Sequence, residues 1–165
     1  MIKFFAVIGF IYYITTVIAF SYKGFLSLRN HIRFKKLLSK TDMKEIIDMI
    51  NKLPNKIDSP HSYEELVSFC NFMLMKFPGN SLWKLNKYLN KHIGKEFNMK
   101  LQLLLISCDE YINSILSLIN VRLKQCVNGE FNMTQKHCDD VRSYVINLQE
   151  EVNTIAVFEH RFKNK

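Results

Sequence analysis

An uncharged and largely apolar run occupies residues 4–22 of the chain. An α-helix rises about 1.5 Å per residue, so crossing a hydrocarbon core of about 30 Å takes about 20 apolar residues. The hydroxyl groups of Thr15 and Thr16, inside the run, can bond to carbonyl groups of the same helix and are tolerated in a bilayer. Tyr22 at the end of the run and Lys23 directly after it resemble an interfacial anchor. The pattern therefore predicts a transmembrane anchor over residues 1–22.

The same run also fits a secretory signal peptide. Lys3 would be its basic start, and Val17 and Ala19 would be the small residues before a cleavage site. Cleavage near Ala19 would release a secreted or lumenal protein, whereas a retained anchor would keep the chain on a membrane. The apolar run continues through Phe20, which favours the retained anchor, and both interpretations stay open on sequence alone.

Residues 23–40 are rich in basic side chains and predict a juxtamembrane helix that continues the anchor. Lys and Arg near a span stay on the cytoplasmic side, so a single-pass protein with a cytoplasmic helical domain is favoured. These side chains could also bind anionic lipid headgroups, or could act only as a topology signal. The residues expected to contact the membrane surface are Lys23, Arg29, Arg33, Lys35 and Lys36.

Three further helices are predicted between residues 41 and 95. A capping-box spacing begins at Asp42, and Pro54 ends the amphipathic pattern that follows. A second capping-box spacing begins at Ser62 and precedes a stretch that is apolar on nearly all sides, which is typical of a buried helix. Ser81 opens a short helix with a row of lysines opposite its apolar stripe, and such a row is usually a solvated face. The stripe consists of Leu82, Leu85, Leu89 and Ile93.

The last third of the chain predicts a long antiparallel helical hairpin over residues 96–163. Apolar residues recur at steps of three and four on both sides of the Asn128-Gly129 turn, as in a coiled-coil seam. Extra apolar positions on the first helix predict that it also packs against the middle helices. The fold class is therefore all-α, with residues 41–165 forming an α-helical bundle. The seam consists of Phe97, Leu101, Leu105, Cys108, Ile112, Ile115, Ile119, Leu123 and Cys126, and then Cys138, Val141, Val145, Leu148, Val152, Ile155 and either Phe158 or Phe162.

The four cysteines contain no CxxC motif, so neither a zinc finger nor a redox motif is indicated. Cys126 and Cys138 are equally far from the centre of the predicted hairpin and should face each other. An oxidising compartment would let them form a disulfide if the chain is exported, whereas in the cytosol they would be small apolar residues. Cys70 and Cys108 would be the remaining pair. No metal ligand set and no cofactor is expected.

The net charge of +8 arises entirely before residue 96, because residues 96–165 are nearly balanced. A basic excess at the membrane end fits a protein that stands on an anionic bilayer, whereas nucleic-acid binding is not expected. Nucleophile-elbow, phosphate-loop and HExxH patterns are missing, so the sequence does not predict an enzyme.

The sequence therefore predicts a membrane-anchored helical protein that acts by protein–protein interaction at a membrane surface. Its expected partners are membrane lipids and another membrane or membrane-associated protein, and a second copy of the chain could also bind. An accessory subunit, an assembly factor or an immunity or exclusion factor would fit. The alternative is a secreted, disulfide-bonded helical ligand, toxin or effector released by cleavage near Ala19.

Overall fold

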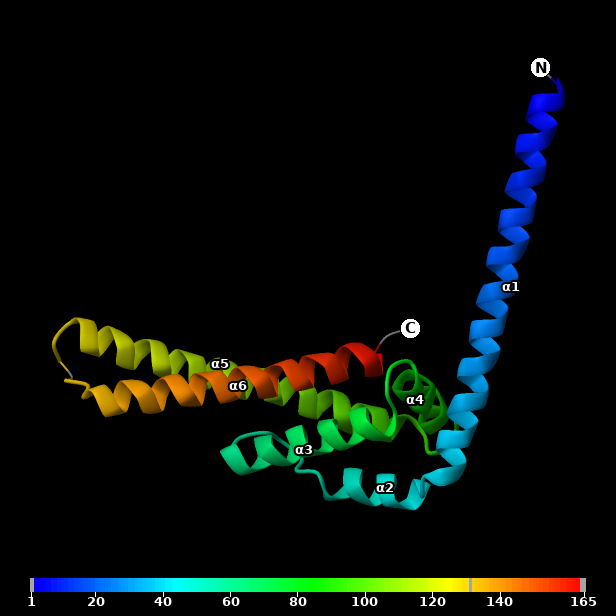
Figure 1. The fold of residues 1–165 in the computed structure, drawn as a ribbon. Coiled ribbons are helices and arrows are strands. Elements are labelled where there is room, and N and C mark those ends of the chain that lie inside the picture. Colours follow the sequence, from blue (N-terminus) through cyan, green and yellow to red (C-terminus); the bar gives the residue numbers. More distant parts are fainter. Residues whose placement is uncertain (1, 131, 164–165) are drawn as a thin grey trace. The chain divides into compact units, whose positions relative to one another are not determined.

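A computed structural model describes residues 2–130 and 132–163, with side chains from Gly9 onward. The described residues form six α-helices and no strand, so the predicted all-α class is confirmed. The chain divides into two compact units, Met1–Asp42 and Met43–Lys165 (Figure 1). The helices are α1 Ile2–Lys40, α2 Met43–Lys52, α3 Pro60–Lys76, α4 Ser81–His92, α5 Lys95–Val127 and α6 Gln135–Lys163.

The first unit is the single unbroken helix α1, which runs through the expected anchor and the basic region without a kink (Figure 1). Residues 1–8 of the expected anchor fall where the structure gives no side chains, or, at residue 1, no description at all. The Thr15 hydroxyl lies 2.9 Å from the Tyr12 carbonyl oxygen, and the Thr16 hydroxyl donates to that oxygen at 2.8 Å. The predicted bonding of these hydroxyl groups within the helix is therefore confirmed.

The start of α3 differs from the sequence prediction. The helix begins at Pro60, and Ser59 is its N-cap, so the expected capping box beginning at Ser62 is wrong. The Ser59 hydroxyl accepts a hydrogen bond from the Ser62 amide at 3.2 Å, and the Ser62 hydroxyl accepts one from the Ser59 amide at 3.1 Å. Proline is favoured at the first helical position because its missing N–H would have no partner there. The Ser-Pro pair thus fixes the start of the helix three residues earlier.

The second unit has one hydrophobic core at the end of the hairpin where α5 begins and α6 ends. In α5 the buried residues stop at Cys108, and in α6 they start at Leu148. Phe158 lies at the centre, with ring centroids 6.0 Å from Phe69 of α3 and 5.4 Å from Phe162. The expected stripe of α4 contributes three fully buried leucines, Leu82, Leu85 and Leu89.

Polar contacts between distant parts of the chain fix the edges of this core. The Asn86 side-chain amide of α4 donates to the Phe162 carbonyl oxygen at 2.8 Å, near the end of α6. The buried Ser107 hydroxyl accepts a hydrogen bond from the Ile57 amide at 3.0 Å, which holds the α2–α3 loop against α5. The Lys100 ammonium donates to the Leu53 carbonyl oxygen at 2.9 Å, just beyond the end of α2. A cation at that position also interacts favourably with the helix dipole.

The helices α5 and α6 run antiparallel and are joined by a short loop in which Gly129 adopts a left-handed backbone with φ 74° (Figure 1). Near the core, α6 packs against α3 and α4, and α5 packs against α4. Beyond the core, the residues of the expected seam are less well buried. Ile112, Ile115 and Ile119 are half-buried, and Leu123 is exposed.

Candidate functional site

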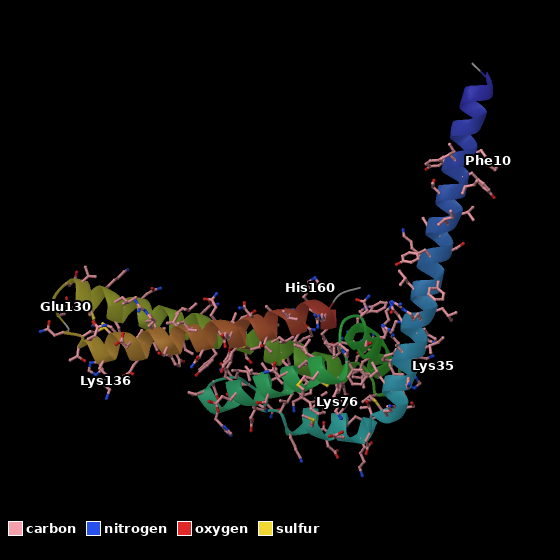
Figure 2. All side chains as sticks on the ribbon, in the orientation of Figure 1. Phe10, Lys35, Lys76, Glu130, Lys136 and His160 are labelled. Atoms are coloured by element: carbon pink, nitrogen blue, oxygen red, sulfur yellow. The ribbon has the colours of Figure 1, made fainter. Side chains whose placement is uncertain are left out.

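The most unusual surface of the chain is the apolar one on α1. From Phe10 to Phe25 the large apolar side chains are exposed on all sides of the helix, for example Tyr12 at 74% and Phe20 at 79% (Figure 2 labels Phe10). Leu26 is half-buried, and Leu28 and Ile32 are exposed again. A soluble protein normally scatters its exposed apolar residues singly, and larger contiguous patches mark interaction sites. The exposed residues are Phe10, Ile11, Tyr12, Tyr13, Ile14, Val17, Ile18, Phe20, Tyr22, Phe25, Leu28 and Ile32.

The C-terminal half of α1 carries a basic stripe, and only three of its four residues are among the expected membrane-contact residues. Because an α-helix turns 100° per residue, Arg29, Arg33, Lys36 and Lys40 fall within about 60° of one another. All four side chains are exposed, and α1 contains no Asp or Glu. The other two expected contact residues, Lys23 and Lys35, are also exposed but belong to other faces of the helix.

Among the described residues one helix has the length and composition of a membrane span, and it is α5, not the helix of the expected N-terminal anchor. Of its most apolar stretch, 28% is buried within the protein. Leu101, Leu104 and Cys108 are fully buried, so the first half of α5 belongs to the core of the second unit. Core helices of soluble proteins have the same length and composition, so this feature alone is weak evidence for a membrane location.

The cysteines fall into two groups. Cys126 is half-buried and Cys138 is exposed, near the two ends of the hairpin loop, and both are free thiols in the structure. Cys70 and Cys108 are fully buried, and burial raises the pKa of the Cys108 thiol to about 12. Burial and then Cys108 raise the pKa of Cys70 as well, and both thiols are free in the structure. The possible disulfide between Cys126 and Cys138 stays a prediction.

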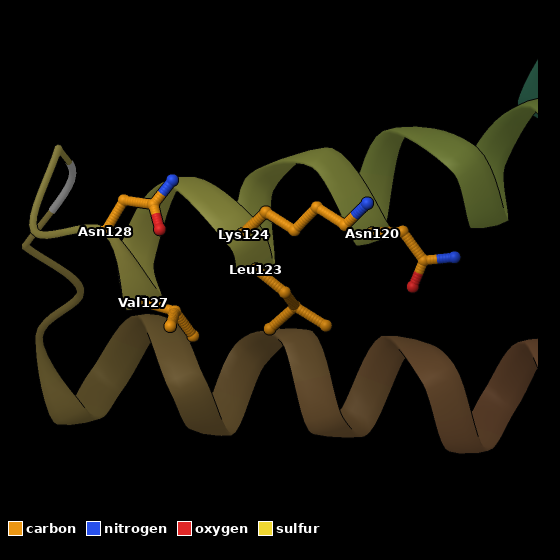
Figure 3. A pocket seen from close by; sticks show the side chains of 5 residues that line it. All are labelled: Asn120, Leu123, Lys124, Val127 and Asn128. Carbon is orange, nitrogen blue, oxygen red and sulfur yellow. The ribbon is translucent and has the colours of Figure 1, made fainter.

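A shallow pocket of about 430 Å³ lies at the tip of the hairpin (Figure 3). Leu123 and Val127 of α5 point toward α6, and Lys124, Asn120 and Asn128 complete the lining. Val127 is 86% exposed, and Leu116, Leu118 and Val121 are exposed further back along the same helix. The distal part of the hairpin thus presents apolar side chains that its own partner helix does not cover.

A smaller pocket of about 200 Å³ lies between the start of α3 and the middle of α5 and α6. Tyr63 of α3 and Tyr111 of α5 line it, with ring centroids 5.8 Å apart. Tyr144, Asn147 and Glu151 of α6 and Glu64 of α3 complete its polar lining. The sequence does not predict this cluster, because its members are spread over three helices and no local spacing joins them.

Another pocket of about 570 Å³ lies between α2 and α3 and has an apolar floor that includes Leu53, Phe69 and Phe72. His61 and Glu65 stand at its rim, with the imidazole Nε2 3.3 Å from a carboxylate oxygen. Both partners are well exposed, so this pair contributes little to stability.

Within the described ranges, no three His, Cys, Asp or Glu side chains form a group that could hold a metal ion. The chain matches no protein-family model, and no curated protein or solved structure is significantly similar to it. Function must therefore be inferred from the surfaces and pockets described above.

Proposed function

We propose that this chain is a single-pass, membrane-anchored helical protein that acts by binding another protein at the membrane surface. The observation that carries the proposal is the all-round exposure of the uncharged part of α1. In water those side chains would remain hydrated, whereas in a bilayer they would meet hydrocarbon. The helix is also long enough, because α1 has 39 residues and a span uses about 20.

The unbroken course of α1 supports a retained anchor over a cleaved signal peptide. The helix passes through Ala19 and continues to Lys40 with no loop at the candidate cleavage site. Insertion of α5 instead would expose its fully buried core residues, among them Leu101 and Leu104, and would dismantle the bundle. These two arguments favour α1 as the membrane-spanning helix.

The basic stripe supports contact with anionic headgroups next to the span. Arg29, Arg33, Lys36 and Lys40 share one exposed face, and each basic residue near an anionic surface contributes about 1 kcal/mol of binding. The same residues favour a cytoplasmic position for the second unit, since Lys and Arg beside a span are retained on that side.

The distal hairpin supports a protein partner. Its exposed apolar residues, such as Leu118 and Val127, lie away from the core and contribute little to folding. Apolar helix faces of this kind bind helices of other proteins. An accessory subunit, an assembly factor or an immunity or exclusion factor would use such a face, and a second copy of the chain could also occupy it.

Membrane fractionation tests the anchor. The full chain should resist extraction by alkaline carbonate and dissolve only in detergent, with an intact mass that includes residues 1–19. Replacing Ile14 and Ile18 by Lys should make it extractable, because each Lys near the middle of a span opposes insertion by about 2.5–3.5 kcal/mol. The matched control is Ile146→Lys, an exposed isoleucine of α6. A mass lacking residues 1–19 in a soluble fraction would contradict the proposal and support the secreted alternative.

Topology can be tested with the exposed thiol of Cys138. A membrane-impermeant maleimide should label it only after the cells are permeabilised, if the second unit is cytoplasmic. Labelling of intact cells would place the unit outside and reverse the expected orientation.

Site-specific photo-crosslinking tests the partner. A photoreactive amino acid at Leu118 should give one stoichiometric cross-linked product in membranes, identified by mass spectrometry as another protein or as a second copy. The same amino acid at Asn153, an exposed position of α6 outside the apolar face, is the control. Equal products at both positions, or none at Leu118, would argue against a specific partner on the hairpin.

A further inference from the structure

The tyrosine-lined pocket between α3, α5 and α6 has the composition of a cation site. Three aromatic rings, from Tyr63, Tyr111 and Tyr144, line it together with the carboxylates of Glu64 and Glu151. No Lys, Arg or His is among the described residues of its lining, so its side chains carry a negative formal charge and no counter-charge. The faces of aromatic rings attract cations, and carboxylates strengthen that attraction.

The Tyr63 hydroxyl is a second and independent observation. Its residue is only 4% exposed, and its oxygen is buried without a hydrogen-bond partner. Nearly all buried hydroxyl groups in folded proteins are hydrogen-bonded, so this hydroxyl of a lining residue can accept a partner that the described side chains do not supply. A hydroxyl oxygen accepts hydrogen bonds from N–H groups, which matches a donor-rich cation.

The negative charge of the carboxylates at the pocket is also unfavourable when no cation is bound. Partial burial and then the Glu64 carboxylate raise the pKa of Glu151, and burial, Cys108 and Glu151 raise the pKa of Tyr63. Repulsion from Glu64 and Glu151 disfavours further negative charge at the pocket and would stabilise a cation, whereas burial disfavours a charge of either sign.

We infer that this pocket binds an alkylammonium group, the charged end of a lysine side chain or of a small aliphatic amine. An ammonium has three N–H donors and no acceptor, so it can bond to the Tyr63 hydroxyl while it faces the carboxylates of Glu64 and Glu151. A water molecule takes about 30 Å³ in the liquid, so about 200 Å³ leaves room for a short alkyl chain as well. This inference does not depend on the membrane anchor.

Titration of the full chain in uncharged maltoside micelles tests it, with n-butylammonium as the probe and the NMR shifts of isotope-labelled tyrosine rings as the readout. Saturable shifts are expected for Tyr63 and Tyr111. Tyr88 lies against His92 with ring centroids 4.3 Å apart, away from the pocket, and should not respond. Absence of saturable shifts, or equally tight binding of neutral 1-butanol, would overturn the inference.

Two pairs of variants assign the binding to named side chains. Glu151→Gln should weaken n-butylammonium at least tenfold, whereas Glu150→Gln, the exposed neighbour outside the pocket, should not change the affinity. Tyr63→Phe removes only the orphan hydroxyl and should weaken binding severalfold, and Tyr88→Phe is its control. Equal affinities for the wild type and Glu151→Gln would overturn the assignment. Glu151→Gln should stay in the membrane fraction, so the test is separate from that of the anchor.

The source of the ammonium group can be distinguished in the same assay. A capped pentapeptide, Gly-Gly-Lys-Gly-Gly, is compared with n-butylammonium. Peptide affinity at least tenfold tighter would assign the pocket to a lysine of a protein ligand, and equal affinity would assign it to a free amine. If neither the peptide nor n-butylammonium binds, the inference is overturned.

Discussion

At the scale of single residues, Glu151 shows how a side chain can lower the stability of its own fold. Its pKa is raised by partial burial and then by Glu64, so the folded state binds the carboxyl proton more tightly than the unfolded state does. The free energy of unfolding is therefore larger below the ordinary Glu pKa and falls as the pH rises through the raised value.

Glu151→Gln should consequently stabilise the free protein at pH 7. The gain should be at most about 1 kcal/mol, because water partly screens the repulsion between Glu151 and Glu64. The gain should disappear near pH 4, where the wild-type carboxyl is protonated as well. Thermal unfolding at both pH values measures it, and a loss of stability at pH 7 would show that Glu151 makes a favourable contact that outweighs this repulsion.

The four thiols should differ in reactivity because the thiolate is the nucleophile. Burial raises the pKa of Cys108 to about 12 and also raises that of Cys70, whereas Cys138 is exposed. Iodoacetamide at pH 8 should therefore modify Cys138 first and Cys126 next, and should reach Cys70 and Cys108 only after unfolding. Intact-mass measurements follow the order.

The same raised pKa values have a consequence for alkaline stability. The folded state holds these two thiol protons more tightly, so their contribution to the free energy of unfolding is complete below pH 9 and lost as the pH rises toward 12.

The alkylation experiment also tests for a disulfide between the two buried cysteines. If Cys70 and Cys108 stay unmodified by iodoacetamide even in denaturant without reductant, they form a disulfide and the chain has passed through an oxidising compartment.

At the scale of the element, the start of α3 depends on a reciprocal pair of serines. Ser59→Ala removes the hydroxyl that accepts the Ser62 amide at 3.2 Å, so it should destabilise the second unit by about 1 kcal/mol. Denaturant unfolding measures the loss, and Ser59→Asp, which can also accept that bond, should retain most of the stability. Equal losses of stability for both variants would show that the Ser59 hydroxyl does not stabilise the protein by capping α3.

Helix existence followed from the sequence more reliably than helix starts. Periodicity predicted the stripe of α4 and the two long helices, because an apolar face must be buried wherever it lies. The cap of α3 was misplaced, because Ser62 and Glu65 are the usual capping-box residues, whereas the box that forms pairs Ser59 with a serine, Ser62. The pocket formed by Tyr63, Tyr111 and Tyr144 could not be predicted, since the register of three helices decides which faces meet.

At the scale of the whole molecule, the two units differ in what stabilises them. The second unit has a core in which Phe158 contacts Phe69 and Phe162, whereas the described side chains of α1 before Phe25 have no such packing. Phe158→Ala should cost about 3–5 kcal/mol, as large aromatic truncations in cores do. Leu118→Ala, at an exposed site, should change stability by less than about 0.5 kcal/mol. Similar losses would show that the hairpin tip belongs to the core.

The position of the core at only one end of the hairpin has a kinetic consequence. The backbone amides of a helix exchange their protons with solvent when the helix opens locally. Poorly packed segments open at the lowest free-energy cost. Amides near residues 118–127 and 135–145 should exchange orders of magnitude faster than those near residues 101–108 and 148–162, which flank Phe158. Hydrogen–deuterium exchange should therefore fall steadily from the loop to the core, and binding of a partner to the distal helices should slow it from the loop inward.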